Sequence, residues 1–176
     1  MTIILTVFVE GYQKREIETR QFLESISASQ VFKSNRLKIQ SKTVERSDIY
    51  SYPEMIKFWW GKEDLILLEH DVSPTIDQFL SLLSCSRPVC NFDYQIPVSK
   101  TEYTILHMGL GLSKFSVLFQ KRIDIEMYLA NQSFMRVDYA ILSAMQSLNQ
   151  SYHSHGEVKH NHRVEDLTED FKLRSF

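Results

Sequence analysis

Alternation between strand-like and helix-like segments over the first ninety residues constrains the fold of this chain most strongly. Apolar or alternating runs typical of strands lie at residues 3–9, 36–44, 64–69 and 88–92. Segments with helical spacing or helix-start signals separate them, at 14–27, at 53–60 and from 73 onward. Strands that alternate with helices in this way predict an α/β protein, with a mostly parallel central sheet and helices on both faces.

The pattern changes in the second half of the chain. Residues 103–107 and 113–119 predict two strands on either side of a Gly-Leu-Gly turn at 109–111. Glycines two positions apart allow a bend or a close approach of the backbone. Apolar residues at helical spacing then predict a long helix around 141–148. We therefore expect a mixed C-terminal part after the parallel one.

Length and charge bound the class of protein. A chain of 176 residues fits one domain, which we place at 1–162, with 163–176 as a charged peripheral tail. The net charge of -2 gives no basic footprint for nucleic acid or an anionic membrane. The apolar N-terminus lacks the basic segment and cleavage site of a signal peptide, and no apolar stretch approaches the roughly 20 residues of a membrane span. We expect a cytoplasmic protein with no nucleic-acid partner and no membrane span.

The chain has two cysteines, Cys85 and Cys90. In a cytoplasmic chain, two closely spaced thiols are more often buried apolar side chains than a disulfide or a zinc site. Their offset of five residues does not form a CxxC motif. The sequence therefore predicts two free, buried thiols, and a disulfide across the intervening residues is the alternative.

Two carboxylates one residue apart, Glu69 and Asp71, follow the buried apolar run at 64–68. Ligands of open α/β sheets bind at the carboxyl ends of strands, and paired carboxylates suit a hard divalent cation that carries a phosphate. Alternate side chains of a strand point the same way, so Glu69 and Asp71 would face one site and His70 would face elsewhere. The alternative is a solvated strand end with ordinary polar residues.

Four of the six histidines lie close together near the C-terminal end: His153, His155, His160 and His162. Neutral imidazole is a common metal ligand, so this cluster suggests part of a metal site, or a zinc site by itself. His160 and His162 flank one residue and would share a face of an extended segment. The His-Asn-His order does not indicate a nuclease, because the surrounding pattern and a basic surface are missing.

Asp138 stands at the start of the helix predicted around 141–148. Taken alone, it is best explained as an N-cap or first-turn acid that suits the helix dipole. The functional alternative is a general base, if this end of the helix faces a cleft.

Taken in order, these pieces resemble GT-A fold glycosyltransferases, and the size is similar to small members from archaeal viruses. That family has a Rossmann-like N-terminal half, an acidic DXD motif after a buried strand, a later helix with an acid, and often a C-terminal histidine at the metal. Residues 64–71 look like the strand and motif, 136–148 like the helix, and 155–162 like the C-terminal segment. Glu69 departs from the motif by one methylene.

The resemblance implies a nucleotide-sugar transferase with Mn²⁺ or Mg²⁺. It places the donor, a UDP- or GDP-sugar, against Val9, Glu10, Gly11, Asp48, Glu69, His70 and Asp71. The implied metal ligands are Asp71, Glu69, His160 and His162, with Asp71 favoured as the direct ligand and Glu69 acting through water or through another ligand. Asp138 would be the catalytic base of an inverting enzyme. The acceptor, a glycan, protein or lipid, is not specified, and a viral protein would act in the host cytoplasm.

Two other classes stay open from the sequence. A metal-dependent phosphoester hydrolase would use the histidines with Asp71 and hold two metals about 3.5–4 Å apart. A non-catalytic α/β interaction protein would show no stabilisation by nucleotides.

Overall fold

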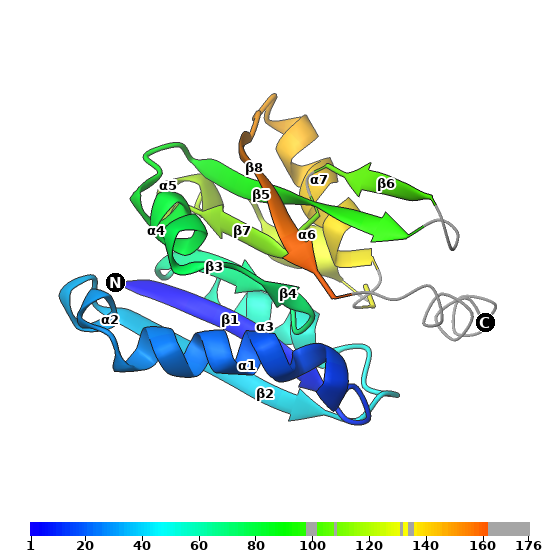
Figure 1. Cartoon of the computed structure of the whole chain (residues 1–176). Helices are drawn as coiled ribbons and strands as arrows, with labels where there is room; N and C mark the ends of the chain where they lie inside the picture. Colours follow the sequence, from blue (N-terminus) through cyan, green and yellow to red (C-terminus); the bar gives the residue numbers. More distant parts are fainter. Residues whose placement is uncertain (98–101, 108, 131, 134–135, 162–176) are drawn as a thin grey trace.

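The computed structural model describes residues 1–97, 102–107, 109–130, 132–133 and 136–161, and its strands form one eight-stranded sheet (Figure 1). The strand order is β2-β1-β3-β7-β5-β8-β4, with β6 paired to β5 off this path. The strands are β1 Thr2–Val9, β2 Leu37–Val44, β3 Asp64–Leu68, β4 Val72–Ser73, β5 Val89–Pro97, β6 Tyr103–Leu106, β7 Leu112–Phe115 and β8 His153–His160. The helices are α1 Gln13–Ala28, α2 Gln30–Ser34, α3 Ser51–Trp59, α4 Ile76–Ser84, α5 Val117–Gln120, α6 Ile125–Leu129 and α7 Val137–Ser147.

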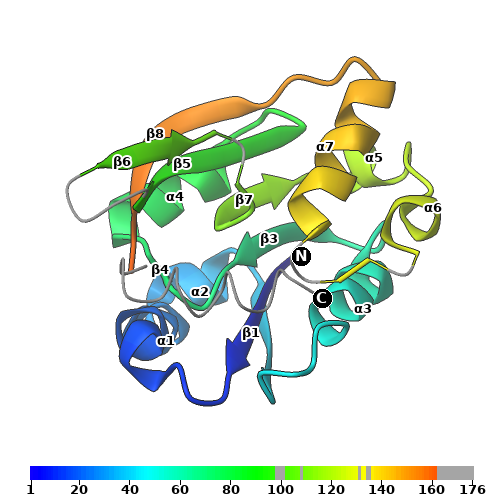
Figure 2. The same cartoon turned by 90° about the vertical axis from the view of Figure 1, so that its right-hand side faces the viewer.

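Helices cover both faces of the sheet, as the alternation predicted (Figure 2). On one face α1 and α4 bury side chains such as Phe22 and Phe79 against the sheet. On the other face α3, α6 and α7 bury Ile56, Leu129 and Ile141. Within the described part of the chain, no helix combines the length and apolar character needed to cross a membrane.

The N-terminal half of the sheet is parallel, because α1 and α3 return the chain to the same edge each time. β1 pairs in parallel with both β2 and β3, which is consistent with a Rossmann-like N-terminal half. Beyond β3 the sheet becomes mixed, as expected for the C-terminal part. There β7 enters without a helical crossover and runs antiparallel to both β3 and β5, so the whole sheet is mixed.

β6 and β7 lie end to end along one edge of β5. Tyr94 of β5 pairs with Leu106 of β6, and Asn91 pairs with Ser113 of β7. The chain between them leaves the ladder, and this interruption contains the Gly-Leu-Gly turn at 109–111. The predicted strand at 103–107 is thus confirmed, whereas the one predicted at 113–119 ends at Phe115. Ser116 Oγ accepts a hydrogen bond from the Phe119 N–H and starts α5 instead.

The strand β8 was not recognised in the sequence, because most of its residues are polar. It runs parallel to β5 and antiparallel to β4, yet Val158 is the only one of its residues that is fully buried. Strand patterns are recognised by alternating apolar residues, and a His-rich segment does not present them. The short helices α2 and α6 were likewise not predicted.

Cys85 and Cys90 form a disulfide, so the prediction of two free thiols is wrong. Cys85 directly follows α4, and Cys90 lies near the start of β5. The intervening turn at 86–88 reverses the chain and brings the two sulfur atoms together. The bridge therefore ties the end of α4 to the centre of the sheet.

Candidate metal and nucleotide site

Glu69 and Asp71 follow β3 at its carboxyl end, but they do not continue the strand. The Val72 N–H donates to the Glu69 carbonyl over 3.2 Å, which closes a turn before β4. The sequence argument from strand alternation was therefore wrong about the local backbone. The turn nevertheless brings both carboxylates to one place, with Asp71 buried and Glu69 partly exposed.

β8 brings His160 to the same place. His160 pairs with Val72 across the β4–β8 ladder, and the Asn161 N–H donates to the Asp71 carbonyl over 2.7 Å. His160 Nε2 lies 3.4 Å from Asp71 Oδ2. One ligand atom from each of Glu69, Asp71 and His160 lies within 4.8 Å of the other two. These three predicted ligands are thus together, whereas His162 lies outside the described residues.

Tyr94 supports two of these three groups, and the sequence analysis missed it. Its ring stacks on His160 with centroids 4.5 Å apart, and its hydroxyl donates a long, 3.5 Å hydrogen bond to Glu69 Oε2. A Cβ on Gly109 would meet the Tyr94 ring at 2.5 Å, and one on Gly111 would meet it at 2.7 Å. The Gly-Leu-Gly turn therefore provides the close backbone approach that its spacing allowed, against a tyrosine rather than a ligand.

Asp138 lies across the same site, in the first turn of α7. Burial raises the pKa of its carboxyl to about 6, although a backbone N–H bond from Leu110 lowers it. Burial also raises the pKa of Tyr52 and of Tyr94, and the charges of Glu69 and Asp138 raise both pKa values further. The four side chains therefore share one neighbourhood. Asp138 was predicted from its position alone to be an acid in the first turn of a helix. The fold shows in addition that it lies in the same neighbourhood as Glu69.

An aromatic wall borders this site at the ends of β1 and β2. The buried His70 ring stacks on Tyr12 with centroids 5.8 Å apart, and the Arg46 guanidinium lies 5.2 Å from the Tyr12 ring centre. Neither ring nitrogen of His70 has a hydrogen-bond partner among the described residues, and Nε2 lies 4.0 Å from Asp71 Oδ2. Tyr12 and Arg46 had no recognisable signal in the sequence.

The residues predicted to contact the nucleoside lie near this wall, but one of them, Asp48, already accepts hydrogen bonds from the protein. Val9 ends β1, and Glu10 and Gly11 follow it on the surface. The Asp48 carboxylate instead accepts bonds from the Ser51 N–H and hydroxyl, at 2.9 and 2.6 Å. These bonds lower its pKa and fix the start of α3. The nucleoside contacts of all four residues stay predictions.

The clustered histidines that the structure describes lie at the two ends of β8. His160 lies at the carboxylates, whereas His153 and His155 lie at the other end of the strand, where His155 neighbours Cys85 and Cys90. The five residues from His155 to His160 span roughly 16 Å of strand. One zinc ion bound by the four clustered histidines is therefore excluded.

No protein-family model matches the chain, and no curated protein matches it in sequence. Among solved structures, A197 from STIV matches with a TM-score of 0.50 and 12% identity, over 90% of this chain and 83% of that chain. A glycosyltransferase involved in the glycosylation of the major capsid of PBCV-1 matches with a TM-score of 0.49 and 9% identity, over 88% and 81%. A putative glucose-1-phosphate thymidylyltransferase from Bacillus anthracis, in complex with a sucrose, matches with a TM-score of 0.46 and 6% identity, over 100% and 96%.

These similarities concern the fold. The match to the viral protein A197 agrees with the resemblance to small viral proteins that the order of the sequence motifs predicted. At such low identity, the activity has to be argued from the residues of the site.

Proposed function

We propose that this protein is a metal-dependent glycosyltransferase that moves a sugar from a nucleoside-diphosphate sugar to an acceptor hydroxyl. The observation that carries the proposal is the convergence of Glu69, Asp71 and His160 at the carboxyl end of β3, with Asp138 near the same tyrosines as Glu69. This is the place where open α/β sheets bind their ligands. It combines a cation site with an acid whose pKa lies near neutrality.

The three donors fit a hard or borderline cation. Two carboxylates and one imidazole suit Mn²⁺ or Mg²⁺ when phosphate and water oxygens fill the remaining positions. Adjacent ligands of an octahedral ion at about 2.1 Å are about 3.0 Å apart, so donors that lie within 4.8 Å of one another would move closer together to bind a common ion. The cation would neutralise charge on the leaving diphosphate.

Asp138 supplies the proton acceptor in this proposal. With a pKa of about 6, it is largely ionised at pH 7 and is still more basic than an ordinary aspartate. In a direct displacement, the acceptor oxygen forms a bond to the anomeric carbon and its proton passes to Asp138. The bond from that carbon to the diphosphate oxygen breaks, and the electron pair leaves with the diphosphate. Such a reaction inverts the anomeric configuration.

The remaining residues orient the donor. The diphosphate lies against the turn of Glu69, His70 and Asp71, and the nucleoside extends over Val9, Glu10 and Gly11. Tyr12 is partly exposed, stacks on His70 and lies near the Arg46 guanidinium, and it offers an aromatic ring there beside which a base can pack. Which base and which sugar bind is left to the experiment.

Thermal unfolding in the presence of a panel of nucleotide-sugars, with and without Mn²⁺, tests the proposal. We expect a UDP- or GDP-sugar to raise the unfolding temperature only when Mn²⁺ is present, and Asp71→Asn to abolish that shift. Asp77→Asn is the matched control, because Asp77 is an exposed acid in the first turn of α4 and is not one of the three donors. Absence of a shift with every donor contradicts the proposal and favours the interaction-protein alternative.

The hydrolase alternative makes a different prediction about metal binding. Among the described residues, only one group of three donors lies at this site, which suits one ion rather than a pair. Stoichiometric binding of two Mn²⁺ ions without nucleotide would favour the hydrolase.

A further inference from the structure

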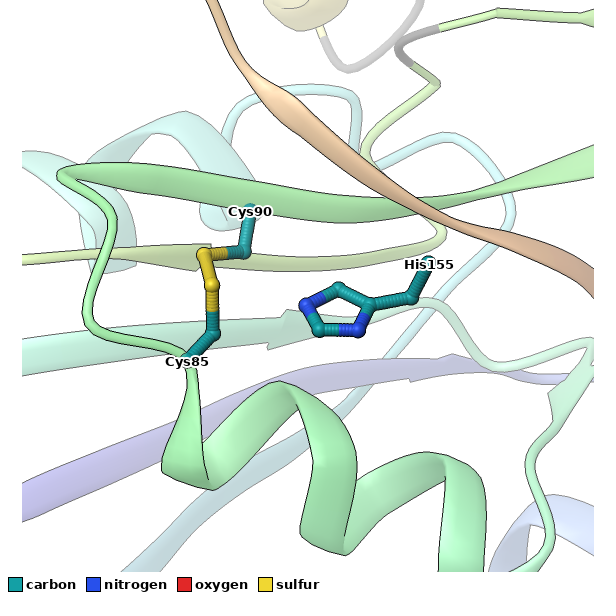
Figure 3. Close-up of side chains that lie close together, drawn as sticks. All are labelled: Cys85, Cys90 and His155. Atoms are coloured by element: carbon teal, nitrogen blue, oxygen red, sulfur yellow. A yellow bond between two sulfur atoms is a disulfide. The ribbon is translucent and has the colours of Figure 1, made fainter.

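A second group of metal-ligating side chains lies at the opposite end of β8 from His160. Cys85 caps the C-terminus of α4, Cys90 belongs to β5 and His155 belongs to β8 (Figure 3). One ligand atom from each residue lies within 4.8 Å of the other two. In Figure 3 the His155 ring points toward the sulfur atoms of the bridge. The end of α4, the start of β5 and the distant strand β8 thus converge on one point.

His155 lacks a partner that its burial requires. Its Nε2 atom is buried and has no hydrogen-bond partner among the described residues. Its ring stacks on Phe92 with centroids 5.4 Å apart, which fixes its plane. A buried polar atom without a partner destabilises the folded state. A ligand that takes an electron pair from this nitrogen would remove that destabilisation.

We propose that, when the Cys85–Cys90 disulfide is reduced, Cys85, Cys90 and His155 bind one borderline-soft divalent cation, for which Zn²⁺ is the best fit. Two thiolates and an imidazole are ligands that Zn²⁺ prefers. This donor set differs from the oxygen-rich set of Glu69, Asp71 and His160, so the proposal does not depend on the proposed function.

The movement that binding requires is small and falls on one residue. In a tetrahedral site with Zn–S bonds of about 2.3 Å, the two sulfur atoms lie about 3.8 Å apart. Cys90 and His155 are held in paired strands, since Cys90 aligns with His153 and Asn91 with Ser154. Cys85 is only partly buried at the end of α4, so its side chain supplies the opening.

The fourth position and the entry path lie on the exposed side. The His153 ring stands edge-on to His155 with centroids 4.7 Å apart, and it is exposed. A surface hollow lined by Arg87, Pro88 and His153, among others, reaches this side. A structural zinc site takes four protein ligands, and we assign the fourth to His153.

Lys114 does not oppose the cation. Its ammonium donates to the carbonyls of Leu83 and Cys85, at 2.7 and 2.8 Å, so it is already held at the end of α4. Zn²⁺ with two thiolates has no net charge. A nearby ammonium also favours the thiolate over the thiol before the metal arrives.

The disulfide and the metal exclude each other. An external dithiol reductant supplies two electrons and two protons to the bridge, which yields two thiols and an oxidised reductant. Each thiol releases its proton to solvent when it binds the cation. A disulfide oxidant reverses the process by taking two electrons from the thiolates, and the cation leaves. In either state the end of α4 stays tied to the sheet.

Titration of the full-length protein with Co²⁺, a coloured substitute for Zn²⁺, tests the proposal. We expect the anaerobically reduced protein to bind one equivalent with thiolate-to-cobalt charge-transfer absorption, and Zn²⁺ to abolish that absorption. The oxidised protein should not give it. A reduced protein without this absorption overturns the proposal.

Variants locate the ligands. His155→Ala should weaken Co²⁺ binding in the reduced protein by at least about tenfold, the lower end of the effect of residues that only support a ligand. Cys90→Ser should abolish the charge-transfer band, and the half-buried Cys85→Ser serves if the first variant does not fold. Asp71→Asn is the control and should keep the band, because it alters only the other site. An unchanged affinity in His155→Ala contradicts the assignment, and an unchanged affinity in His153→Ala contradicts the fourth ligand.

Discussion

The two ends of β8 carry donor sets of opposite chemical character. At one end His160 joins the oxygen donors Glu69 and Asp71, and at the other His155 faces the sulfur atoms of Cys85 and Cys90. The same residue type on the same strand therefore belongs to two kinds of site. The turn after β3 brings carboxylates to one histidine, and the end of α4 brings a sulfur atom to the other. These neighbouring side chains decide which cation suits each end of β8.

Asp71→Asn is expected to have the largest effect, and only at the oxygen-rich end. A metal ion that stabilises the leaving group contributes several kcal/mol to the transition state, so loss of a ligand should reduce sugar transfer about a thousandfold. The measurement is the release of nucleoside diphosphate in the presence of Mn²⁺. Full activity in this variant would remove Asp71 from the metal site.

Asp138→Asn should reduce the rate and increase stability together. Loss of a general base costs roughly 10²–10⁴-fold in rate. The pKa of Asp138 is raised from 3.8 to about 6, so the folded state binds more protons between about pH 4 and pH 6. Stability of the wild type therefore falls as the pH rises through that window. Asparagine avoids the buried charge and should add about 1–2 kcal/mol to the free energy of unfolding at pH 7.

Denaturant unfolding of wild type and Asp138→Asn at pH 4 and pH 7 measures this difference. The gain should disappear at pH 4, where the wild-type carboxyl is protonated. The rate of the wild type should also rise with pH through about 6. A variant that is less stable than the wild type at pH 7 would assign Asp138 to the start of α7 alone.

Gly109→Ala tests the support of the oxygen-rich end. The new Cβ would meet the Tyr94 ring at 2.5 Å, and overpacking of this kind costs about 1–3 kcal/mol. Displacement of Tyr94 should also weaken Mn²⁺-dependent donor binding, because the Tyr94 ring stacks on His160 and holds its plane. A double-mutant cycle with Tyr94→Ala measures the coupling. Additive effects would mean that Gly109 and Tyr94 do not act through this contact.

Reduction of the disulfide should have the smallest effect, confined to the sulfur-rich end. The bridge closes a loop with a sequence separation of five residues, which corresponds to about 2 kcal/mol in a chain-entropy model. The reduced protein should lose that stability, and Zn²⁺ should restore part of it. Thermal unfolding of the reduced protein with and without Zn²⁺ provides the measurement, with Cys85→Ser as the variant that Zn²⁺ should not stabilise.

The sequence predicted what depends on local pattern and missed what depends on distant pairing. The elements from β1 to α4, except α2 and β4, follow from local sequence patterns, and Glu69, Asp71 and His160 were selected by residue type. β8 was missed because its pairing with β5 and β4 compensates for a polar sequence. Its absence from the prediction explains why His155 and His160 were grouped together. Cys85 and Cys90 were predicted to be free thiols because a cytoplasmic location was expected. Tyr94 could have been noticed from the glycines at 109 and 111, which indicate a bulky neighbour without naming it.

The central claim is that Glu69, Asp71 and His160 hold the cation that carries the nucleotide-sugar. A crystal of the protein grown with Mn²⁺ and a nucleoside-diphosphate sugar, measured for anomalous scattering by manganese, tests it directly. The account predicts an anomalous peak within roughly 2.0–2.3 Å of an atom of Asp71 and of His160, with diphosphate oxygens on its open side and Glu69 bound directly or through water. A nucleotide bound with no manganese between these residues, or manganese bound elsewhere, would contradict it.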